Sequence, residues 1–298
     1  MRRNYDILWK GLLDEVFDDF LRFVFPAVEE DLDLERGFLF LDKELGQMFP
    51  EPQKKSATRH VDKLVKVYKK NGEERWLLVH VEIQDKKDAA LPQRMFQYFY
   101  RIMDKHNHPI TAVAMFTGAD GKKMPDRYED RCLGTELVYK YNTIRITDYS
   151  DEDLMANENP FAIVMLVAKQ GLLKGEEFDQ ILLDKKMLIV NLLHDRGIYS
   201  KEKINAIMIF LNNYVLFKKS ENNSNFMKQV DAKTNKEDTM GILEQLAEIK
   251  REEGLEEGLE KSVKGLLKRT DFSSGKIAEI LEVKRSFVDR IKKEMNNN

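Results

Sequence analysis

Cysteine is nearly absent from this sequence, since Cys132 is the only one among 298 residues. A single cysteine excludes an internal disulfide and suits a reducing compartment such as the cytoplasm. The sequence also contains no CxxC pattern and no clustered set of histidine and cysteine residues. It therefore lacks the ligand clusters that structural zinc sites use.

Long apolar runs are missing as well. The longest, residues 161–168, is much shorter than the ~20 apolar residues that a membrane-spanning helix requires. Residues 1–25 start with basic side chains and continue as an amphipathic segment with several acids, unlike the apolar region of a secretory signal. We expect a cytoplasmic protein that does not insert into a membrane.

The sequence also lacks a large excess of positive or negative charge. Lys and Arg number 49 and Asp and Glu 52, which gives a formal net charge of −3, although 34% of the residues are charged. The whole chain thus lacks the basic excess typical of nucleic-acid-binding domains, and any DNA-binding surface has to be local. The hydrophobic content of 42% is enough for one large core with appendages or for two domains.

The most informative stretch runs from residue 60 to residue 84. Residues 60–67 and 75–84 each alternate apolar and polar side chains, and Asn71-Gly72 lies between them. Alternation with a period of two predicts half-buried strands, and Asn-Gly is a strong signal for a tight turn between paired strands. The stretch is therefore predicted to be a β-hairpin.

Two acids, Asp62 and Glu82, stand inside these apolar runs, where carboxylates are disfavoured. A two-residue loop at Asn71-Gly72 would place them on opposite faces. A three-residue loop at residues 71–73 would place Asp62 directly opposite Glu82, with Gln84 one step further on the same face. Adjacent carboxylates repel unless a cation neutralises them, and Mg²⁺ commonly binds one or two carboxylates while keeping several waters. The alternative is a solvated face whose acids and lysines merely keep the sheet soluble.

The order of these residues resembles the PD-(D/E)XK nuclease superfamily, in the branch that ends in E-x-Q. More closely, the chain is similar to the Rpn family of recombination-promoting nucleases and putative transposases. The matching pieces are most evident over the first half of the chain: residues 5–10 with 20–26, residues 59–62, residues 80–84, and residues 94–98 with Arg101.

The resemblance implies a metal-dependent DNA endonuclease that hydrolyses phosphodiester bonds with Mg²⁺, or with Mn²⁺ in its place. Asp62, Glu82 and the backbone carbonyl of Ile83 would hold the ion, and Gln84 would complete the catalytic set. Gln84 stands where the superfamily more often has lysine. A neutral amide can orient water and bind a phosphate oxygen, but it cannot offset developing negative charge as an ammonium does.

Other side chains are candidates to support this site. Lys66 and Lys86 share the parity of the acidic face and are candidates for the missing positive charge, although both also fit a solvated surface. Residues 7–25 have helical spacing, and Pro26 ends the helix. Acids on this helix fit a solvated face, and Glu15 is the candidate that would approach the metal.

A second helix is predicted over residues 89–106, directly after the E-x-Q strand. Arg94, Gln97 and Arg101 lie on one face of it at positions i, i+3 and i+7. Arginine matches phosphate through paired hydrogen bonds, so this face is a candidate for DNA phosphate binding. The alternative is a face that only keeps the helix soluble.

The order of the predicted elements gives the fold class. Strands are predicted at residues 110–117 and 137–147, after the helix, which indicates an α/β fold with a mixed β-sheet flanked by helices. Together with the resemblance, this predicts a restriction-endonuclease-like sheet followed by an α-helical C-terminal region. The predicted parts are a nuclease core at 1–159, a helical extension at 160–219, a polar linker at 220–238, and a charged helix with a tail at 239–298.

The tail is predicted to be a small helix-turn-helix, with helices at residues 275–281 and 285–294. Residues 261–293 contain ten Lys and Arg against four Asp and Glu, a local basic excess. Arg285, Arg290 and Lys293 would face outward as DNA contacts. The alternative is a helical hairpin used for assembly, and the charged helix before it, residues 239–268, is a candidate for self-association into a homo-oligomer.

The sequence thus favours a Mg²⁺-dependent endonuclease that acts on DNA, related to transposition and recombination-promoting enzymes. The alternative is a non-catalytic DNA-binding or partner-binding relic of a mobile element, which keeps the sheet without a productive metal site. A third interpretation, a small-molecule hydrolase, rests only on the neighbouring His194 and Asp195.

Overall fold

The computed structural model describes residues 5–41, 45, 60–82, 89–108, 110–233, 258–270, 272–283 and 285–295. The chain divides into two compact units, Met1–Lys236 and Glu237–Asn298.

The first unit contains a five-stranded mixed sheet. Its strand order is β1-β2-β3-β4-β7, in which β1 pairs with β2 and β2 with β3 in antiparallel fashion, while β3, β4 and β7 run parallel. The strands are β1 (Leu39–Phe40), β2 (His60–Tyr68), β3 (Glu74–Glu82), β4 (Ile110–Phe116) and β7 (Asn142–Arg145). The α/β fold class with a mixed, helix-flanked sheet is confirmed.

The predicted hairpin forms, with a shift in register. Tyr68 pairs with Glu74, and the amide of Lys69 donates to the carbonyl of Glu73, so the loop is at residues 70–72. Gly72 has a φ of +89°, a backbone conformation that glycine adopts without strain. The loop has the expected three residues but begins one residue earlier, so Asp62 is opposite His80 and not, as predicted, opposite Glu82.

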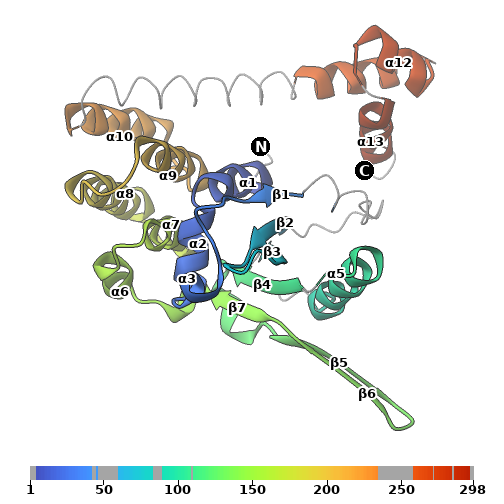
Figure 1. The fold of residues 1–298 in the computed structure, drawn as a ribbon. Coiled ribbons are helices and arrows are strands. Elements are labelled where there is room, and N and C mark those ends of the chain that lie inside the picture. Colours follow the sequence, from blue (N-terminus) through green and yellow to red (C-terminus); the bar gives the residue numbers. More distant parts are fainter. Residues whose placement is uncertain are drawn as a thin grey trace. The chain divides into compact units, whose positions relative to one another are not determined.

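Helices cover both faces of the sheet (Figure 1). Helix α5 (Leu91–His106) packs on one face, where Leu64, Trp76 and Leu78 are buried with residues of the helix. On the other side lie α1 (Tyr5–Glu15), α2 (Phe17–Val24) and α7 (Pro160–Lys169). The predicted single helix over residues 7–25 is therefore two helices, with a break at Val16, whose φ and ψ of −121° and 25° leave the helical region.

The remaining part of the first unit is mainly helical. The helical extension predicted after residue 160 is present as α7, α8 (Phe178–Asp195) and α9 (Lys201–Tyr214). Helix α7 packs against α2, and α9 packs against α1. These contacts join residues 160–219 to the sheet within one unit, so the structure has no domain boundary at residue 159. The further helices are α3 (Val28–Asp31), α6 (Asp151–Ala156) and α10 (Ser220–Lys233), with short 3₁₀ turns at Ala119–Lys123, Ile146–Asp148 and Gln170–Leu172.

Helix α10 overturns the predicted polar linker at residues 220–238 over its first fourteen residues. The sequence there is rich in asparagine, but Phe226 and Val230 are fully buried, and α10 packs against α8. Asp179 of α8 accepts hydrogen bonds from the backbone amides of Lys218 and Lys219 just before the helix begins. The buried Phe226 and Val230 and the contacts of Asp179 thus hold a segment whose composition favours a loop.

The strand predicted at residues 137–147 is also different. Tyr141 separates two strands, β6 (Thr135–Lys140) and β7, and β6 pairs with β5 (Arg127–Cys132) in a separate two-stranded hairpin. Leu133 and Gly134 form its turn, both with positive φ, at 45° and 86°. This is the two-residue turn whose twist matches paired strands. The hairpin projects away from the five-stranded sheet (Figure 1).

The second unit contains helices at the two places where the sequence predicts a helix-turn-helix. Residues 258–269 are helical, and α12 (Ser274–Ile280) and α13 (Arg285–Met295) follow. The Ser273 hydroxyl accepts a hydrogen bond from the Lys276 amide and caps α12. A small core forms from Val263, Ile277, Ala278, Val288 and Ile291. Within the described parts of both units, no helix combines the length and apolarity required to cross a membrane.

Candidate functional site

The carboxyl ends of three parallel strands meet at one edge of the five-stranded sheet. Glu82, Phe116 and Arg145 end β3, β4 and β7, and the register places the three in one row. The first residues of the antiparallel strand β2 lie beside this row, because His60 pairs with Glu82. Ligands of open α/β sheets bind outside the carboxyl ends of their strands. The predicted acidic positions are therefore at the edge where such sheets carry their sites.

Positions 62 and 82 share one face of the sheet. Asp62 pairs with His80, and Glu82 follows His80 by two residues on β3, which makes the acidic positions diagonal neighbours. Such neighbours lie roughly 7–8 Å apart, within reach of one ion held between two extended side chains. The face is the one that α5 covers, since Leu64 and Leu78 share this parity and are buried with α5. For Asp62 and Glu82 the structure describes the backbone register alone.

His80 stands between the two acidic positions, and the sequence interpretation gave it no role. Its side chain is fully buried, and its Nε2 atom lies 3.3 Å from Nη2 of Arg94 in the first turns of α5. A guanidinium only donates hydrogen bonds, so the imidazole accepts here, which requires its neutral form with the proton on Nδ1. His80 therefore attaches Arg94 to the acidic face of the sheet.

The three residues of the predicted phosphate-binding face have different environments. Arg94 is partly buried beside His80, whereas Gln97 and Arg101 are exposed further along α5. Arg94 is thus the member of this set that the structure brings to the acidic positions. Ile83 and Gln84, the other predicted members of the site, lie outside the described residues, as does Lys86.

The lysines near Asp62 in the sequence are engaged elsewhere. Lys66 has the parity of the acidic face, but its Nζ pairs with Glu74 at 3.0 Å, at the opposite end of the hairpin. Lys63 points to the other face, where its fully buried Nζ lies 2.6 Å from Asp14 and 4.2 Å from the centre of the Phe40 ring. Among the described side chains, Arg94 therefore provides the positive charge on the acidic face that the sequence interpretation sought in Lys66.

The helix acid Glu15 is not brought to this face. Asp14 contacts Lys63 on the opposite side of the sheet, and the neighbouring Glu15 is exposed at the end of α1. The expectation that Glu15 would approach a metal at positions 62 and 82 therefore lacks the required geometry.

Tyr141 lies close enough to Arg94 and Arg145 to be influenced by their charges. Tyr141 is nearly buried, and its hydroxyl donates to the carbonyl of Pro125 at 2.9 Å. Burial and the nearby Asp126 raise the pKa of Tyr141 to about 12, although Arg145 and Arg94 act in the opposite direction. Tyr141 therefore remains a protonated hydrogen-bond donor at neutral pH. Arg145 donates to the carbonyls of Gly121 and Met124 and to Thr143, so its guanidinium is held by the chain.

The donor chemistry at positions 62 and 82 fits a hard divalent cation. Two carboxylate side chains on one face supply the oxygen ligands that Mg²⁺ prefers, and the waters that it keeps would fill its remaining positions. Among the side chains that the structure describes, no group of three His, Cys, Asp or Glu residues is placed to hold a metal. A cation at this edge would therefore depend on Asp62 and Glu82 with backbone and water ligands.

No protein-family model, curated protein or solved structure matches the chain. The resemblance to recombination-promoting nucleases therefore remains a prediction that rests on the residues themselves. The arrangement of Asp62, His80, Glu82 and Arg94 has to be judged on its own chemistry.

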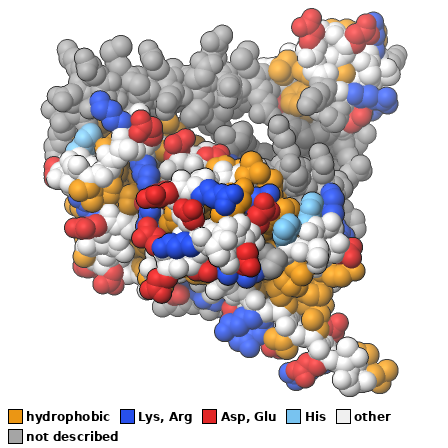
Figure 2. Space-filling view, in the orientation of Figure 1, with side chains coloured by type: hydrophobic (Ala, Val, Ile, Leu, Met, Phe, Trp, Pro, Cys, Tyr) orange, Lys and Arg blue, Asp and Glu red, His pale blue; other side chains and the backbone are white. Residues whose placement is uncertain are grey.

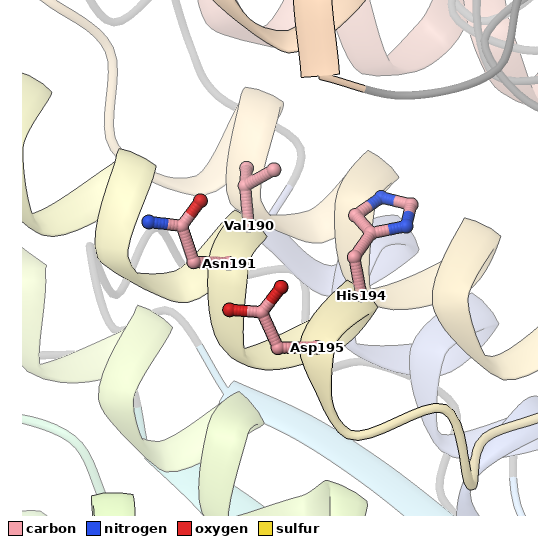
Figure 3. A pocket seen from close by; sticks show the side chains of 4 residues that line it. All are labelled: Val190, Asn191, His194 and Asp195. Atoms are coloured by element: carbon pink, nitrogen blue, oxygen red, sulfur yellow. The ribbon is translucent and has the colours of Figure 1, made fainter.

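A second candidate site lies on α8. A pocket of about 340 Å³ is lined, within the described residues, by Val190, Asn191, His194 and Asp195. Figure 3 shows these side chains on successive turns of one helix, with the imidazole of His194 directed away from the carboxylate of Asp195. His194 and Asp195 form no hydrogen bond or ion pair with each other, and no nucleophilic side chain lines the described part of the pocket. The arrangement does not support a hydrolase that uses His194.

The predicted DNA contacts of the tail lie on α13. The side chain of Arg285 is 74% exposed, and its Nε lies 3.7 Å from Asp289 in the next turn. For Arg290 and Lys293 the backbone is described but the side chain is not. The two helices pack on each other through a small core, which fits both a helix-turn-helix and a helical hairpin used for assembly, and the contact of the tail with DNA remains a prediction.

Proposed function

We propose that the protein is a metal-dependent endonuclease that hydrolyses phosphodiester bonds of DNA, of the kind found in recombination-promoting nucleases. The observation that supports this proposal most strongly is the β2–β3 register. It puts two acidic positions on one face at the carboxyl edge of the sheet, where His80 binds Arg94. A purely solvated face would not bury a histidine between the two acids.

Each residue has a role in this reaction. Asp62 and Glu82, with the carbonyl of Ile83, would hold the cation. A cation held there would supply Lewis-acid chemistry at the phosphate and at the attacking water. Arg94 donates hydrogen bonds to non-bridging phosphate oxygens and offsets their charge as the phosphorus becomes five-coordinate.

His80 and Gln84 act around this centre. His80 is a positioning residue, because its neutral imidazole accepts from Arg94 and fixes the guanidinium at the acidic face. Gln84 orients the attacking water through its amide oxygen. The water adds to phosphorus, one bridging P–O bond breaks, and the proton of the water passes to solvent while the leaving oxygen is protonated.

DNA is the proposed substrate because of the second unit. Within it, residues 261–293 have a local basic excess, and this excess and the two helices α12 and α13 fit a module that binds the phosphate backbone through counterion release. Such a module would hold the substrate while the sheet edge carries out the cleavage. The binding would be independent of the active-site acids.

The proposal is tested by incubating the purified full chain with supercoiled plasmid DNA in Mg²⁺, in Mn²⁺ and in excess EDTA. Nicked and linear products are expected with either cation and not with EDTA. DNA that stays intact under all conditions, although the protein binds it, would instead favour a non-catalytic DNA-binding protein that retains the sheet.

A further inference from the structure

The β5–β6 hairpin has a free edge that is suited to pairing with a second copy of itself. Helix α5 packs against β5, and Phe96 of α5 stacks on Tyr128 of β5 with ring centroids 5.3 Å apart. Beyond this base the hairpin extends away from the five-stranded sheet (Figure 1), and because it is a two-stranded sheet, β5 and β6 each have one unpaired edge. A two-stranded hairpin alone in water is marginally stable, so a projecting one gains from additional strands.

The register of the hairpin shows which groups of β6 point to the free edge. Cys132 and Thr135 flank the two-residue turn, and such a pair exchanges both backbone hydrogen bonds. Hydrogen-bonded pairs then alternate along the ladder, so Thr135, Leu137 and Tyr139 bond to β5. The amides and carbonyls of the other three residues, Glu136, Val138 and Lys140, point outward. The strand contains neither proline nor a bulge, features that commonly prevent an edge from pairing.

The side chains of these three residues are self-complementary. Glu136, Val138 and Lys140 lie on one face and are exposed, Val138 at 51%. Consider two β6 strands from two copies that pair in antiparallel fashion with Val138 at the centre. The outward amides and carbonyls of all three residues then form hydrogen bonds with the other copy. Val138 lies opposite Val138, and Glu136 of each copy lies opposite Lys140 of the other. Opposite charges in such cross-strand positions stabilise pairing.

The charges around Lys140 leave room for such a partner. Its cross-strand neighbour in the hairpin is Arg127, a like charge. Asp126 attracts Lys140 but forms its ion pair with Arg127, and Lys140 forms no ion pair with any described residue. Glu136 already pairs with Arg131 at 2.7 Å. The Glu136 of a second copy would place a carboxylate beside Lys140 and extend this pair into an alternating ladder.

Charge also argues against DNA as the occupant of this surface. Along the hairpin the basic Arg127, Arg131 and Lys140 are balanced by Glu129, Asp130 and Glu136. Figure 2 shows acidic and basic side chains together along the projecting hairpin and hydrophobic ones beside its base. A phosphate-binding arm would instead carry a basic excess.

We propose that the protein forms a two-fold dimer in which the β6 strands of two copies pair in antiparallel register about Val138, giving a continuous four-stranded sheet. This inference does not depend on the nuclease activity. It identifies a self-association surface other than the charged helix before the tail.

The test is sedimentation equilibrium of the full chain, with variants that act on one edge at a time. Val138→Pro removes an outward amide that would donate a hydrogen bond only to the second copy. Glu129→Pro is the control, because Glu129 is the cross-strand partner of Val138 and its amide points to the unpaired edge of β5. The wild type and Glu129→Pro are expected to dimerise, and Val138→Pro to raise the dimer dissociation constant at least tenfold. A monomeric wild type, or equal dissociation constants for the two proline variants, would overturn the proposal.

Charge exchange tests the register itself. Glu136→Lys and Lys140→Glu each place like charges opposite one another and should weaken the dimer, while the double variant restores opposite charges and should recover much of the affinity. In a Cys132→Ser background, Val138→Cys should form an intermolecular disulfide under mild oxidation, because its two Cα atoms would be about 5.5 Å apart. Glu129→Cys is the control. No recovery in the double variant, or equal cross-linking at both positions, would show that the strands do not pair in this way.

Discussion

His80 shows how a residue at a candidate site escapes interpretation from sequence. It occupies a polar position in an alternating strand, where any hydrophilic side chain fits the pattern. Its importance comes from a contact across the layers, since Arg94 arrives from a helix fourteen residues later. Spacing along one element predicts which residues share a face, but it does not predict which side chain of another element meets them.

At the residue scale, Arg94→Ala is expected to weaken DNA binding by about ten- to a hundredfold, the effect of losing charge-assisted hydrogen bonds to phosphate. The variant should remain folded. It should lose about 1–3 kcal/mol of stability, because the buried His80 acceptor loses its partner. DNA affinity by fluorescence anisotropy and urea unfolding would measure the two effects.

Lys105→Ala is the matched control for Arg94→Ala, since it removes one positive charge from the exposed last turn of the same helix. It should change DNA affinity by less than about threefold. Equal losses in both variants would assign Arg94 to a general electrostatic effect, and an unchanged affinity in Arg94→Ala would remove it from the site.

At the scale of elements, the two hairpins of the first unit differ in how well the sequence predicts them. The β2–β3 hairpin combines strong alternation with an Asn-Gly turn, and only its register is shifted by one position on the loop. The β5–β6 hairpin has charged residues on both faces of β5 and turns at Leu133-Gly134. Leucine in a left-handed conformation is a rare turn residue, so the pattern gave no signal for that hairpin.

Helices α2 and α9 are joined by a cluster of charged side chains. Nζ of Lys203 on α9 lies 2.6 Å from Asp19 and 3.0 Å from Asp18, and Arg22 contacts Asp18 at 2.7 Å. Burial alone would raise the pKa of Asp18, but hydrogen bonds from Lys203 and Arg22 outweigh it and hold the pKa below its usual value. Burial raises the pKa of the adjacent Asp19. The lysine therefore compensates two neighbouring carboxylates.

Lys203→Met is expected to destabilise the first unit at pH 7 by about 1–3 kcal/mol, because both carboxylates lose their shared cation. A carboxyl group with a lowered pKa stabilises the fold above its unfolded pKa, here 3.8, and this contribution is lost as the pH falls through the lower folded value. In the variant the two aspartates keep Arg22 but lose the lysine, so protonation relieves their repulsion at a higher pH than in the wild type. The difference in unfolding free energy between variant and wild type should thus shrink between pH 7 and pH 4.

Urea unfolding at the two pH values measures this difference. Lys174→Met, the same substitution at an exposed lysine, is the control and should stay within about 0.5 kcal/mol of wild type at both. A deficit that is independent of pH would contradict the assigned role of the aspartates.

At the scale of the whole molecule, the sequence predicted the sheet and the helices better than it predicted which of them belong to one domain. The mixed sheet, α5 and the helices after residue 160 follow from clear periodicity. The expected boundary at 159 is absent because α7 and α9 pack on helices from the start of the chain. Such long-range packing has no local signature. That positions 62 and 82 share one face was predicted, while the exact register and the buried His80 between them required the structure.

The division between the two units gives a prediction about truncation. Removing residues 237–298 should leave 1–236 folded, because it is a compact unit with its own core. The truncated chain should bind DNA more weakly and with a shallower dependence on salt, since fewer phosphate contacts release fewer counterions. Circular dichroism melts and anisotropy titrations at several salt concentrations test both statements. An unaltered affinity and salt slope would restrict the tail to assembly.

The central claim is that Asp62 and Glu82 together hold the cation that DNA cleavage requires. The most direct test is the rate of plasmid cleavage by Glu82→Gln and by Asp62→Asn in Mg²⁺. Each amide keeps nearly the shape of the acid, so folding should be retained. The rate should fall at least about a hundredfold, since even outer partners of a metal site contribute ten- to a hundredfold. Glu74→Gln, at the far end of β3 on the same face, should cleave at the wild-type rate. Wild-type cleavage by either Glu82→Gln or Asp62→Asn would contradict the account.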